Sequence, residues 1–191
     1  MAVNYLFPSF IASKKCNFDV NSIESKLYEM KENFPESIGH SSKHGWHSPF
    51  FGPNDKDLIS LLQELNSEIA TLVNEIGVSF SGIEVESMWS VINGKGSYNN
   101  SHIHGNCNLS GVLYVKCPQN CGNIVFENVM DQRCGLYGKI KNPEYANMYS
   151  SYWIEPEENL LLLFHPDQRH YVDVNESDED RISISFNMRV R

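Results

Sequence analysis

The feature that most constrains the fold is a closely spaced series of strand-like segments from about residue 83 to the end of the chain. Turns with Gly, Pro, Asn or Asp separate most of them, and one long insertion lies at 128–150. Short strands at this spacing predict an antiparallel sandwich or barrel. The predicted strands are IEVESMWSVIN, NLSGVLYVK, GNIVFENV, SYWIEP, NLLLLFHP, HYVDV and RISISFNMRV.

The last of these segments alternates polar and apolar residues. Arg181, Ser183 and Ser185 share one face of such a strand, and the intervening residues on the other face are apolar. We expect the apolar face to pack outward against helices and the polar face to line the barrel. A buried arginine there needs an anion, and a bidentate carboxylate is its natural partner. In the alternative, Arg181 lies at the surface or pairs with Asp178 or Asp180.

Two amphipathic helices are predicted before the strands. Residues 19–34 form the first, which ends before Pro35. The second begins after a cap at Asn54-Asp55, carries a leucine-rich face and ends at Gly77. The sequence thus predicts a single compact domain. Its two parts are an N-terminal helical layer, 1–82, and a β-rich catalytic core, 83–191, on which that layer packs. Within the layer, residues 1–15 are expected to supply an edge strand punctuated by Pro8.

Composition limits the possible partners and compartment. With a net charge of −9 and a pI near 5.2, the surface repels phosphate backbones, so nucleic acid is not an expected partner. No apolar stretch approaches the ~18 residues of a membrane span, and the N-terminal lysines follow the apolar residues. We therefore expect a soluble cytoplasmic protein. Its odd number of cysteines, five, predicts free thiols.

Three histidines are candidate metal ligands. His102 and His104 share one face of an extended segment, about 6–7 Å apart along the backbone, and His170 precedes a later strand. Three neutral imidazoles would leave open positions on an ion, as non-haem Fe(II) oxygenases require, although those enzymes usually use two histidines and one carboxylate. The alternative is that these are polar surface histidines. His40, His44 and His47, near Trp46 in a long loop, are either simply polar or a second metal cluster.

Other side chains near the histidine pair are candidate ligand contacts. Tyr114 has the same strand parity as both histidines, so its hydroxyl is expected to point the same way unless it is a core tyrosine. Trp89, Asn93 and Asn108 are candidate substrate contacts, with turn support as the alternative for the asparagines.

The order of these features resembles the Fe(II)/2-oxoglutarate dioxygenase superfamily. More narrowly, MWSVINGKGSYNNSHIHGNCNLSGVLYV, LLLFHPDQRHYVDV and RISISFN are similar to a family of 2-oxoglutarate oxygenases, many found in marine bacteria and their phages. The resemblance covers residues 83–191 strongly, and NYLFPSF and GWHSPFF more loosely. It implies a double-stranded β-helix (a jelly-roll or cupin-like barrel) with N-terminal helices, and a cytoplasmic enzyme that could be phage-encoded.

The resemblance also implies roles for individual residues. His102 and His170 would bind Fe(II), while Arg181 and Ser183, helped by Tyr114, would hold the distal carboxylate of 2-oxoglutarate. His104 stands where the wider superfamily has Asp or Glu. The site would therefore be a three-histidine centre, or a two-histidine centre with water or halide in the gap. With O2, such an enzyme would hydroxylate a C–H bond of an amino acid, a peptide or a small metabolite.

Two other functions remain open. The spacing Gly96-x5-His102-x-His104 matches the opening of a cupin motif, but Leu109 stands where a glutamate is expected. Cupin chemistry would also not require Arg181-x-Ser183. A barrel that has lost catalysis and only binds a partner is the other alternative, and the metal content of the purified protein would distinguish it from both enzymes.

Overall fold

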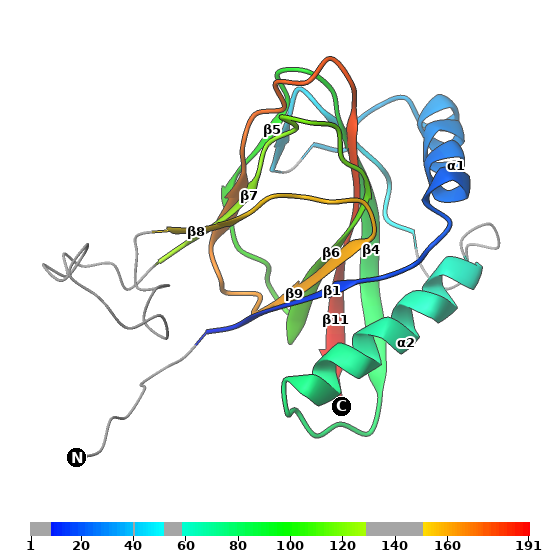
Figure 1. Cartoon of the computed structure of the whole chain (residues 1–191). Helices are drawn as coiled ribbons and strands as arrows, with labels where there is room; N and C mark the ends of the chain where they lie inside the picture. Colours follow the sequence, from blue (N-terminus) through cyan, green and yellow to red (C-terminus); the bar gives the residue numbers. More distant parts are fainter. Residues whose placement is uncertain (1–8, 40, 52–58, 129–150) are drawn as a thin grey trace, which may run out of the picture.

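The computed structural model describes residues 9–39, 41–51, 59–128 and 151–191. These residues form two facing antiparallel sheets, with two helices against one of them (Figure 1). The six-stranded sheet has the order β1 (Ile11–Lys15), β9 (Leu160–Phe164), β6 (Leu109–Lys116), β11 (Arg181–Val190), β4 (Ile83–Asn93) and β3 (Trp46–His47). The five-stranded sheet has the order β2 (Ser42–Lys43), β5 (Tyr98–His102), β10 (His170–Val172), β7 (Ile124–Glu127) and β8 (Ser151–Ile154).

The chain passes back and forth between the two sheets. From β4 to β11, successive strands alternate between the sheets, except that β7 and β8 pair with each other as neighbours. This alternation is the winding of a double-stranded β-helix. The predicted fold class, mainly β with N-terminal helices, is therefore confirmed.

Both predicted helices are present. Helix α1 (Val20–Asn33) begins after Asp19, whose side chain accepts a hydrogen bond from the backbone N–H of Ser22 at 3.2 Å. Helix α2 (Ile59–Glu75) ends at Gly77, which has a φ of 83°. The N–H of Val78 reaches back to the Val73 carbonyl at 3.2 Å, the bond expected of a glycine-terminated helix. The predicted cap at Asn54-Asp55 lies outside the described residues.

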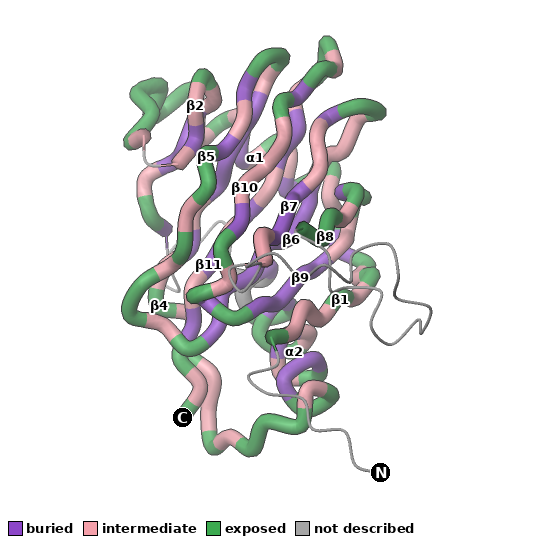
Figure 2. The backbone as a smooth tube through the Cα atoms, turned by 90° about the vertical axis from the view of Figure 1, so that its left-hand side faces the viewer, coloured by how far each residue is buried: buried purple, intermediate pink, exposed green. Residues whose placement is uncertain are grey.

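The larger hydrophobic core lies between the helices and the six-stranded sheet. It holds Leu27 of α1, Leu65 and Ile69 of α2, and Ile182, Ile184, Phe186 and Met188 of β11, all of them fully buried. The predicted outward packing of the apolar face of β11 is thus confirmed. Figure 2 shows the same pattern, with buried segments on the central strands and exposed loops at their ends.

The second core is smaller and lies between the two sheets. Its buried members are Val112, Tyr114, Ile124, Phe126, Leu162 and Phe164. Because this inner core is small, the rest of the space between the sheets is available to polar side chains from β5, β10 and β11.

Some strands were not predicted from the sequence. Strand β5 has the polar sequence YNNSH, and the two-residue strands β2 and β3 lie in the long loop predicted around His44 and His47. β1 is an edge strand, as predicted, and begins at Ile11; residues 1–8 lie outside the described part. Strands β1, β2 and β3 all precede residue 83 and pair with β9, β5 and β4, so the N-terminal segment contributes to both sheets as well as to the helical layer.

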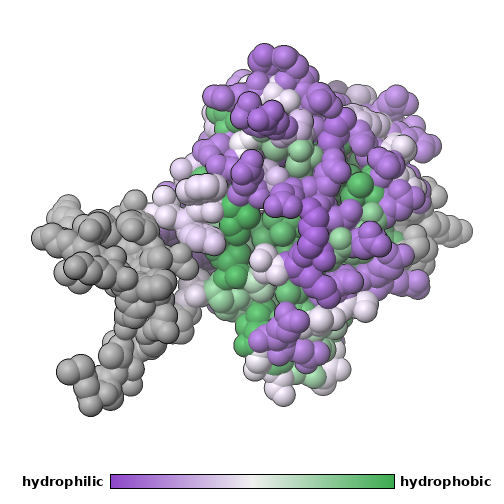
Figure 3. Space-filling model, viewed as in Figure 1, coloured by the Kyte–Doolittle hydropathy of each residue, from purple (hydrophilic) through white to green (hydrophobic). Residues whose placement is uncertain are grey.

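Three further features concern the surface hydropathy, the cysteine thiols and the prediction that no segment spans a membrane. Hydrophilic residues cover the top and right of the face shown in Figure 3, whereas hydrophobic residues come to the surface in its middle, over β9. The described cysteines, Cys16, Cys107, Cys117 and Cys121, are free thiols as predicted, and Cys134 lies outside the described ranges. Within those ranges, no helix combines the length and apolar composition needed to span a bilayer.

Candidate active site

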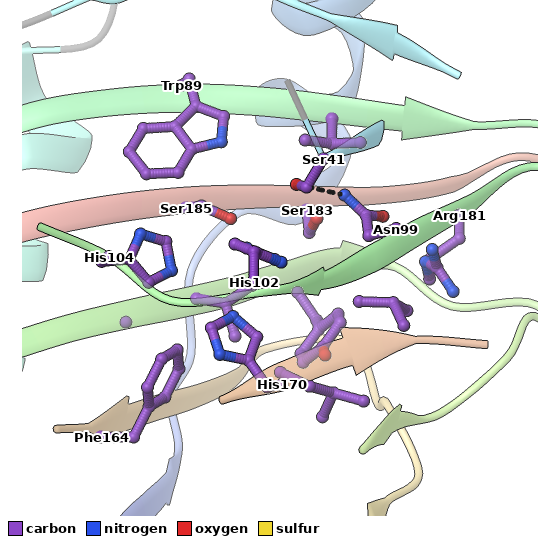
Figure 4. A pocket seen from close by; sticks show the side chains of 16 residues that line it. Ser41, Trp89, Asn99, His102, His104, Phe164, His170, Arg181, Ser183 and Ser185 are labelled. Atoms are coloured by element: carbon purple, nitrogen blue, oxygen red, sulfur yellow. Dashed lines mark hydrogen bonds between the residues drawn. The ribbon is translucent and has the colours of Figure 1, made fainter. Parts of the chain in front are cut away.

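The three predicted histidines lie together between the sheets. His102 ends β5 and His170 begins β10, and the two residues are directly paired across these strands. His104 follows two residues after β5, where its backbone N–H donates to the Pro166 carbonyl at 2.9 Å. One ring nitrogen from each histidine lies within 4.8 Å of the others. Figure 4 shows the three rings converging from different backbone segments.

Backbone carbonyls fix the orientation of two of these rings. The Nδ1 of His102 lies 2.7 Å from the Asn100 carbonyl oxygen, and the Nδ1 of His170 lies 2.8 Å from that of Gln168. A carbonyl can only accept, so each Nδ1 carries the proton and each Nε2 keeps its lone pair. This second hydrogen bond is the usual way in which proteins orient a metal-binding histidine.

The electrostatic environment keeps the histidines neutral. Burial, with the neighbouring imidazoles adding to it, lowers the pKa of His104 to about 3. Burial and then His102 lower the pKa of His170 to about 4, and burial also lowers the pKa of His102. Neutral imidazole is the form that binds metals, so the set is ready to act as ligands at neutral pH.

These shifts predict how the metal-free protein responds to acid. The folded pKa values of about 3 and 4 lie below the ordinary 6.5, so the unfolded chain binds protons first as the pH falls. We expect the free energy of unfolding to decrease from about pH 6.5 down to about pH 3. Urea titrations at several pH values measure it. Carboxylates also titrate at the acid end, so the decrease should be compared with that of His170→Leu, which lacks one of the imidazoles. Identical pH profiles for the two proteins would contradict the prediction.

Aromatic side chains flank the histidines on one side. The Phe164 ring centroid lies 4.8 Å from that of His170 in an edge-to-face arrangement, and Phe126 lies 5.8 Å from the same ring. These rings exclude water from one side of the histidine cluster. The sequence did not single out Phe164, because the run LLLLF is apolar throughout and carries no alternation that separates inward from outward residues.

Arg181 is the first residue of β11 and is 2% exposed. It lines a cavity between the sheets that the three histidines also line, and it lies at the end of that cavity away from them. Its Nη1 donates to the backbone carbonyls of Cys121 at 2.5 Å and Gly122 at 3.3 Å. Asp178 instead binds Lys95, and Asp180 accepts from the Tyr28 hydroxyl. Neither acidic neighbour therefore pairs with the arginine.

The arginine is consequently a buried cation held by neutral groups. Among the described residues, no carboxylate forms an ion pair with it, and burial lowers the pKa of Arg181. An uncompensated buried charge is unfavourable. This position in the cavity therefore suits an anionic ligand.

Two hydroxyl side chains lie near Arg181. Ser183 is on the same strand, β11, and Tyr114 is on the neighbouring strand β6. The two residues are register partners between β11 and β6, and both line the cavity that contains the histidines. Burial raises the pKa of Tyr114, which keeps its hydroxyl protonated and able to donate. The cavity has a volume of about 50 Å³. An arginine, a serine and a tyrosine hydroxyl together provide the donors that a carboxylate accepts from.

The donor sets thus fit an iron ion and a dicarboxylate. Imidazole nitrogen suits Fe(II), and the three histidines supply nitrogen donors from one side only. The arginine end of the cavity supplies positive charge and hydrogen-bond donors. Both ends belong to one cavity, as the labelled side chains in Figure 4 show.

The candidate asparagines have structural contacts in the fold. The Asn93 carboxamide bonds to Asn99 at 2.9 Å, and the Asn108 side chain accepts from the Val190 N–H at 3.0 Å. Neither Asn93 nor Asn108 lines the cavities beside the histidines, whereas Trp89 lines both of them. Asn99 and Ser41, which the sequence did not identify as a site pair, face the cavity and are linked at 3.3 Å.

The two described loop histidines, His44 and His47, do not join the cluster. His47 is buried, with its Nδ1 2.7 Å from the Ser48 carbonyl, and stacks on Trp89. His44 has a positive φ and lies near Tyr98, while His40 lies outside the described residues. Within the described part of the chain, His102, His104 and His170 form the one group placed to hold a metal ion.

Comparisons with known proteins agree with this geometry. The model of a family described as "Putative 2OG-Fe(II) oxygenase" matches residues 87–187, more than half of the chain. No curated protein matches the chain significantly.

Solved structures share the fold at low sequence identity. A viral collagen prolyl hydroxylase from Paramecium bursaria Chlorella virus-1, in its 2OG complex, is 12% identical, with a TM-score of 0.63 over 95% of this chain and 96% of that one. A Trichoplax adhaerens prolyl hydroxylase, bound to a peptide of hypoxia inducible factor, is 13% identical, with a TM-score of 0.64 over 95% and 83%. HygX from Streptomyces hygroscopicus, with nickel, 2-oxoglutarate and hygromycin B bound, is 12% identical, with a TM-score of 0.64 over 95% and 83%.

At these identities the structural likeness shows the shared fold, and the family match supplies the activity. The chain therefore belongs to the 2OG-Fe(II) oxygenase family and is a 2-oxoglutarate-dependent oxygenase that uses Fe(II), 2-oxoglutarate and O2.

Proposed function

We propose that this oxygenase hydroxylates a C–H bond of an amino acid, a peptide or a small metabolite. His102, His104 and His170 would hold Fe(II), and Arg181 would bind the distal carboxylate of 2-oxoglutarate with Ser183 and Tyr114. The observation that carries the proposal is the buried guanidinium of Arg181. It lines the same cavity as the histidines and has no carboxylate partner among the described residues.

Each side chain would contribute a physical effect that the structure supports. The carbonyl-bound Nδ1 atoms hold His102 and His170 in the tautomer that presents Nε2. Arg181 supplies a positive charge that is buried and held in place by backbone carbonyls before a carboxylate arrives. The protonated Tyr114 hydroxyl adds a donor, and Phe164 excludes water on one side of the histidines.

The cofactor supplies the oxidising chemistry. A bound Fe(II) would allow 2-oxoglutarate and O2 to react, giving succinate and CO2. One oxygen atom of O2 would enter succinate, and the other would become the hydroxyl group of the product. The remaining tasks of binding, orientation and exclusion of water belong to the residues of this chain.

Substrate class and domain organisation are part of the same proposal. The comparison structures include one with a peptide substrate and one with hygromycin B, so peptides and small molecules both suit this fold. Nucleic acid is a poor partner for a chain with a net charge of −9. We further propose that residues 1–82, whose strands β1, β2 and β3 join the two sheets and whose helices pack on the catalytic core 83–191, form one compact domain with that core.

A turnover assay tests the proposed activity. The protein is loaded with Fe(II) under nitrogen, given 2-oxoglutarate and candidate substrates, and then exposed to O2 while succinate is followed. We expect succinate formation that requires Fe(II) and increases with a true substrate. Stoichiometric metal binding without any succinate would favour a cupin enzyme, and no metal binding would favour a barrel that only binds a partner.

The role of His104 gives a separate prediction. If His104 is the third ligand, His104→Ala should lower Fe(II) affinity by more than the about 10–100-fold typical of outer-shell changes. His104→Asp should retain Fe(II), because it creates the two-histidine, one-carboxylate set common in Fe(II) oxygenases. Titration of the metal-free variants with Fe(II) under nitrogen measures both affinities. Wild-type affinity in His104→Ala would instead support a two-histidine centre.

A further inference from the structure

A second cleft opens beside the histidines on the side away from Arg181. Its volume is about 500 Å³, and it shares Ser41, Trp89, His102 and His104 with the cavity that contains Arg181. The proposed metal centre therefore lies between two spaces, one with a buried cation and one that opens outward. A substrate that meets the metal would enter through the second.

Aromatic rings form one wall of this cleft. The His47 ring stacks on Trp89 with centroids 5.8 Å apart and planes 8° apart, and Phe50 meets Trp89 edge-on at 5.7 Å. Trp89 in turn lies 5.9 Å from the ring of His104. This series of rings runs from Phe50, which is 56% exposed, to the proposed metal ligand. A continuous series of aromatic rings, with Trp89 at its centre, thus leads from solvent to the proposed metal centre.

Strand register orders the residues by depth. Arg181 of β11 pairs with Asn93 of β4 at one end, and Asn187 pairs with Ser87 at the other. At about 3.3 Å per residue, Arg181 and Asn187 are roughly 20 Å apart along the strand. Trp89 pairs with Ser185 between them. The same strand face therefore presents a cation at the cosubstrate end and an amide at the mouth of the cleft.

The lining of the cleft is polar but carries no fixed charge. None of the described residues that line it is Lys, Arg, Asp or Glu; its polar groups are hydroxyls, carboxamides and imidazoles. Ser110 donates to the Asn187 carbonyl oxygen at 2.8 Å, so the NH₂ group of that carboxamide remains as a donor. A charged group entering the cleft would lose water without gaining a counter-ion from the described lining residues, whereas an uncharged group would not lose a charge's hydration.

We propose that this cleft binds an uncharged substrate group, an aliphatic side chain or saturated ring next to an amide. Its apolar face packs on Trp89, and its amide oxygen accepts from the Asn187 carboxamide. The inference rests on the proposed hydroxylase function, since it names the group that the oxidant would meet. It assigns Trp89 and Asn187 as specificity-determining residues.

Binding without turnover tests this inference. The probes are the N-acetyl amides of proline, leucine, lysine and glutamate, titrated calorimetrically into the Fe(II)–2-oxoglutarate protein under nitrogen. We expect the two uncharged probes to bind at least about tenfold more tightly than the two charged ones, given the cost of burying an unpaired charge. A second set places each residue within a glycine-serine pentapeptide. Tighter binding of that set would indicate a peptide as the source of the group, and tighter binding of the free amides a small metabolite.

Variants assign the effect to the cleft. Trp89→Leu should weaken the uncharged probes about tenfold, while Trp153→Leu, at an exposed tryptophan on β8, should leave them unchanged. Asn187→Asp preserves shape and the bond from Ser110 but adds a negative charge, so it should favour the lysine probe over the leucine probe. This near-isosteric variant also serves if Trp89→Leu fails to fold.

Several results would overturn the inference. They are equal binding of charged and uncharged probes, no binding of any probe, or an Asn187→Asp variant with unchanged preference. Failure of the proposed function looks different, because it removes Fe(II)-dependent succinate formation while the probes continue to bind and to depend on Trp89.

Discussion

Replacing Arg181 with Met should weaken 2-oxoglutarate binding by about 10²-fold or more while Fe(II) binding persists. Arg181 is a buried cation among backbone carbonyls, and removing one partner of a buried charge pair typically costs about 3–5 kcal/mol. Methionine keeps much of the apolar volume but has no donor. Titration of the Fe(II) protein with 2-oxoglutarate under nitrogen, followed by its charge-transfer absorption, measures the effect.

A matched control lies on the same strand. Arg189 of β11 is half exposed and pairs with Glu86, so Arg189→Met should bind 2-oxoglutarate like the wild type. Equal affinity in Arg181→Met and wild type would refute the assignment of the distal carboxylate. A wild-type protein without any charge-transfer band would likewise favour cupin chemistry over 2-oxoglutarate binding.

Much of the barrel could be predicted because its strands carry their own signals. The alternation of polar and apolar residues in RISISF predicts a strand with one face against the helices and one face inward, and β11 has that arrangement. The Leu-rich face of 59–75 and the glycine after it similarly predict α2. In each case the local pattern and the tertiary packing favour the same structure.

Strand β5 could not be predicted, because its sequence YNNSH has no apolar alternation. Its pairing partners supply what the sequence lacks: β10 on one side and β2 on the other place it in the sheet. Buried carboxamide bonds add to this, since Asn99 binds both Asn93 and Ser41. Polar strands of this kind are specified by tertiary hydrogen bonds rather than by burial of apolar surface.

The candidate site could also be predicted only in part, because some of its features depend on tertiary structure. Histidine spacing and the position of Arg181 are visible in the sequence, and the structure brings these residues to one cavity. The carbonyls that orient His102 and His170 are backbone atoms, which no residue type reveals. The aromatic wall around Trp89 depends on His47 and Phe50, which come from a distant loop.

The histidines should account for essentially all Fe(II) binding. We expect His170→Ala and His102→Ala each to lose stoichiometric Fe(II), because one ring nitrogen from each of the three histidines lies within 4.8 Å of the others and two ligands cannot replace three. Outer-shell changes alone typically cost about 10–100-fold in metal affinity, so loss of a ligand should exceed that range. Metal analysis after gel filtration and Fe(II) titration of the metal-free protein measure the loss.

Loss of packing must be separated from loss of the ligand. His170 is 4% exposed between Phe164 and Phe126, so alanine there leaves a cavity, whereas His170→Leu fills it without supplying a nitrogen. Both variants should therefore fail to bind Fe(II), even though His170→Leu should keep more of its stability. His165→Ala, at a histidine whose side chain is 50% exposed, should bind Fe(II) normally. Full iron occupancy in His170→Leu would show that the ion binds elsewhere, because leucine restores the packing of that position and only the ring nitrogen is missing.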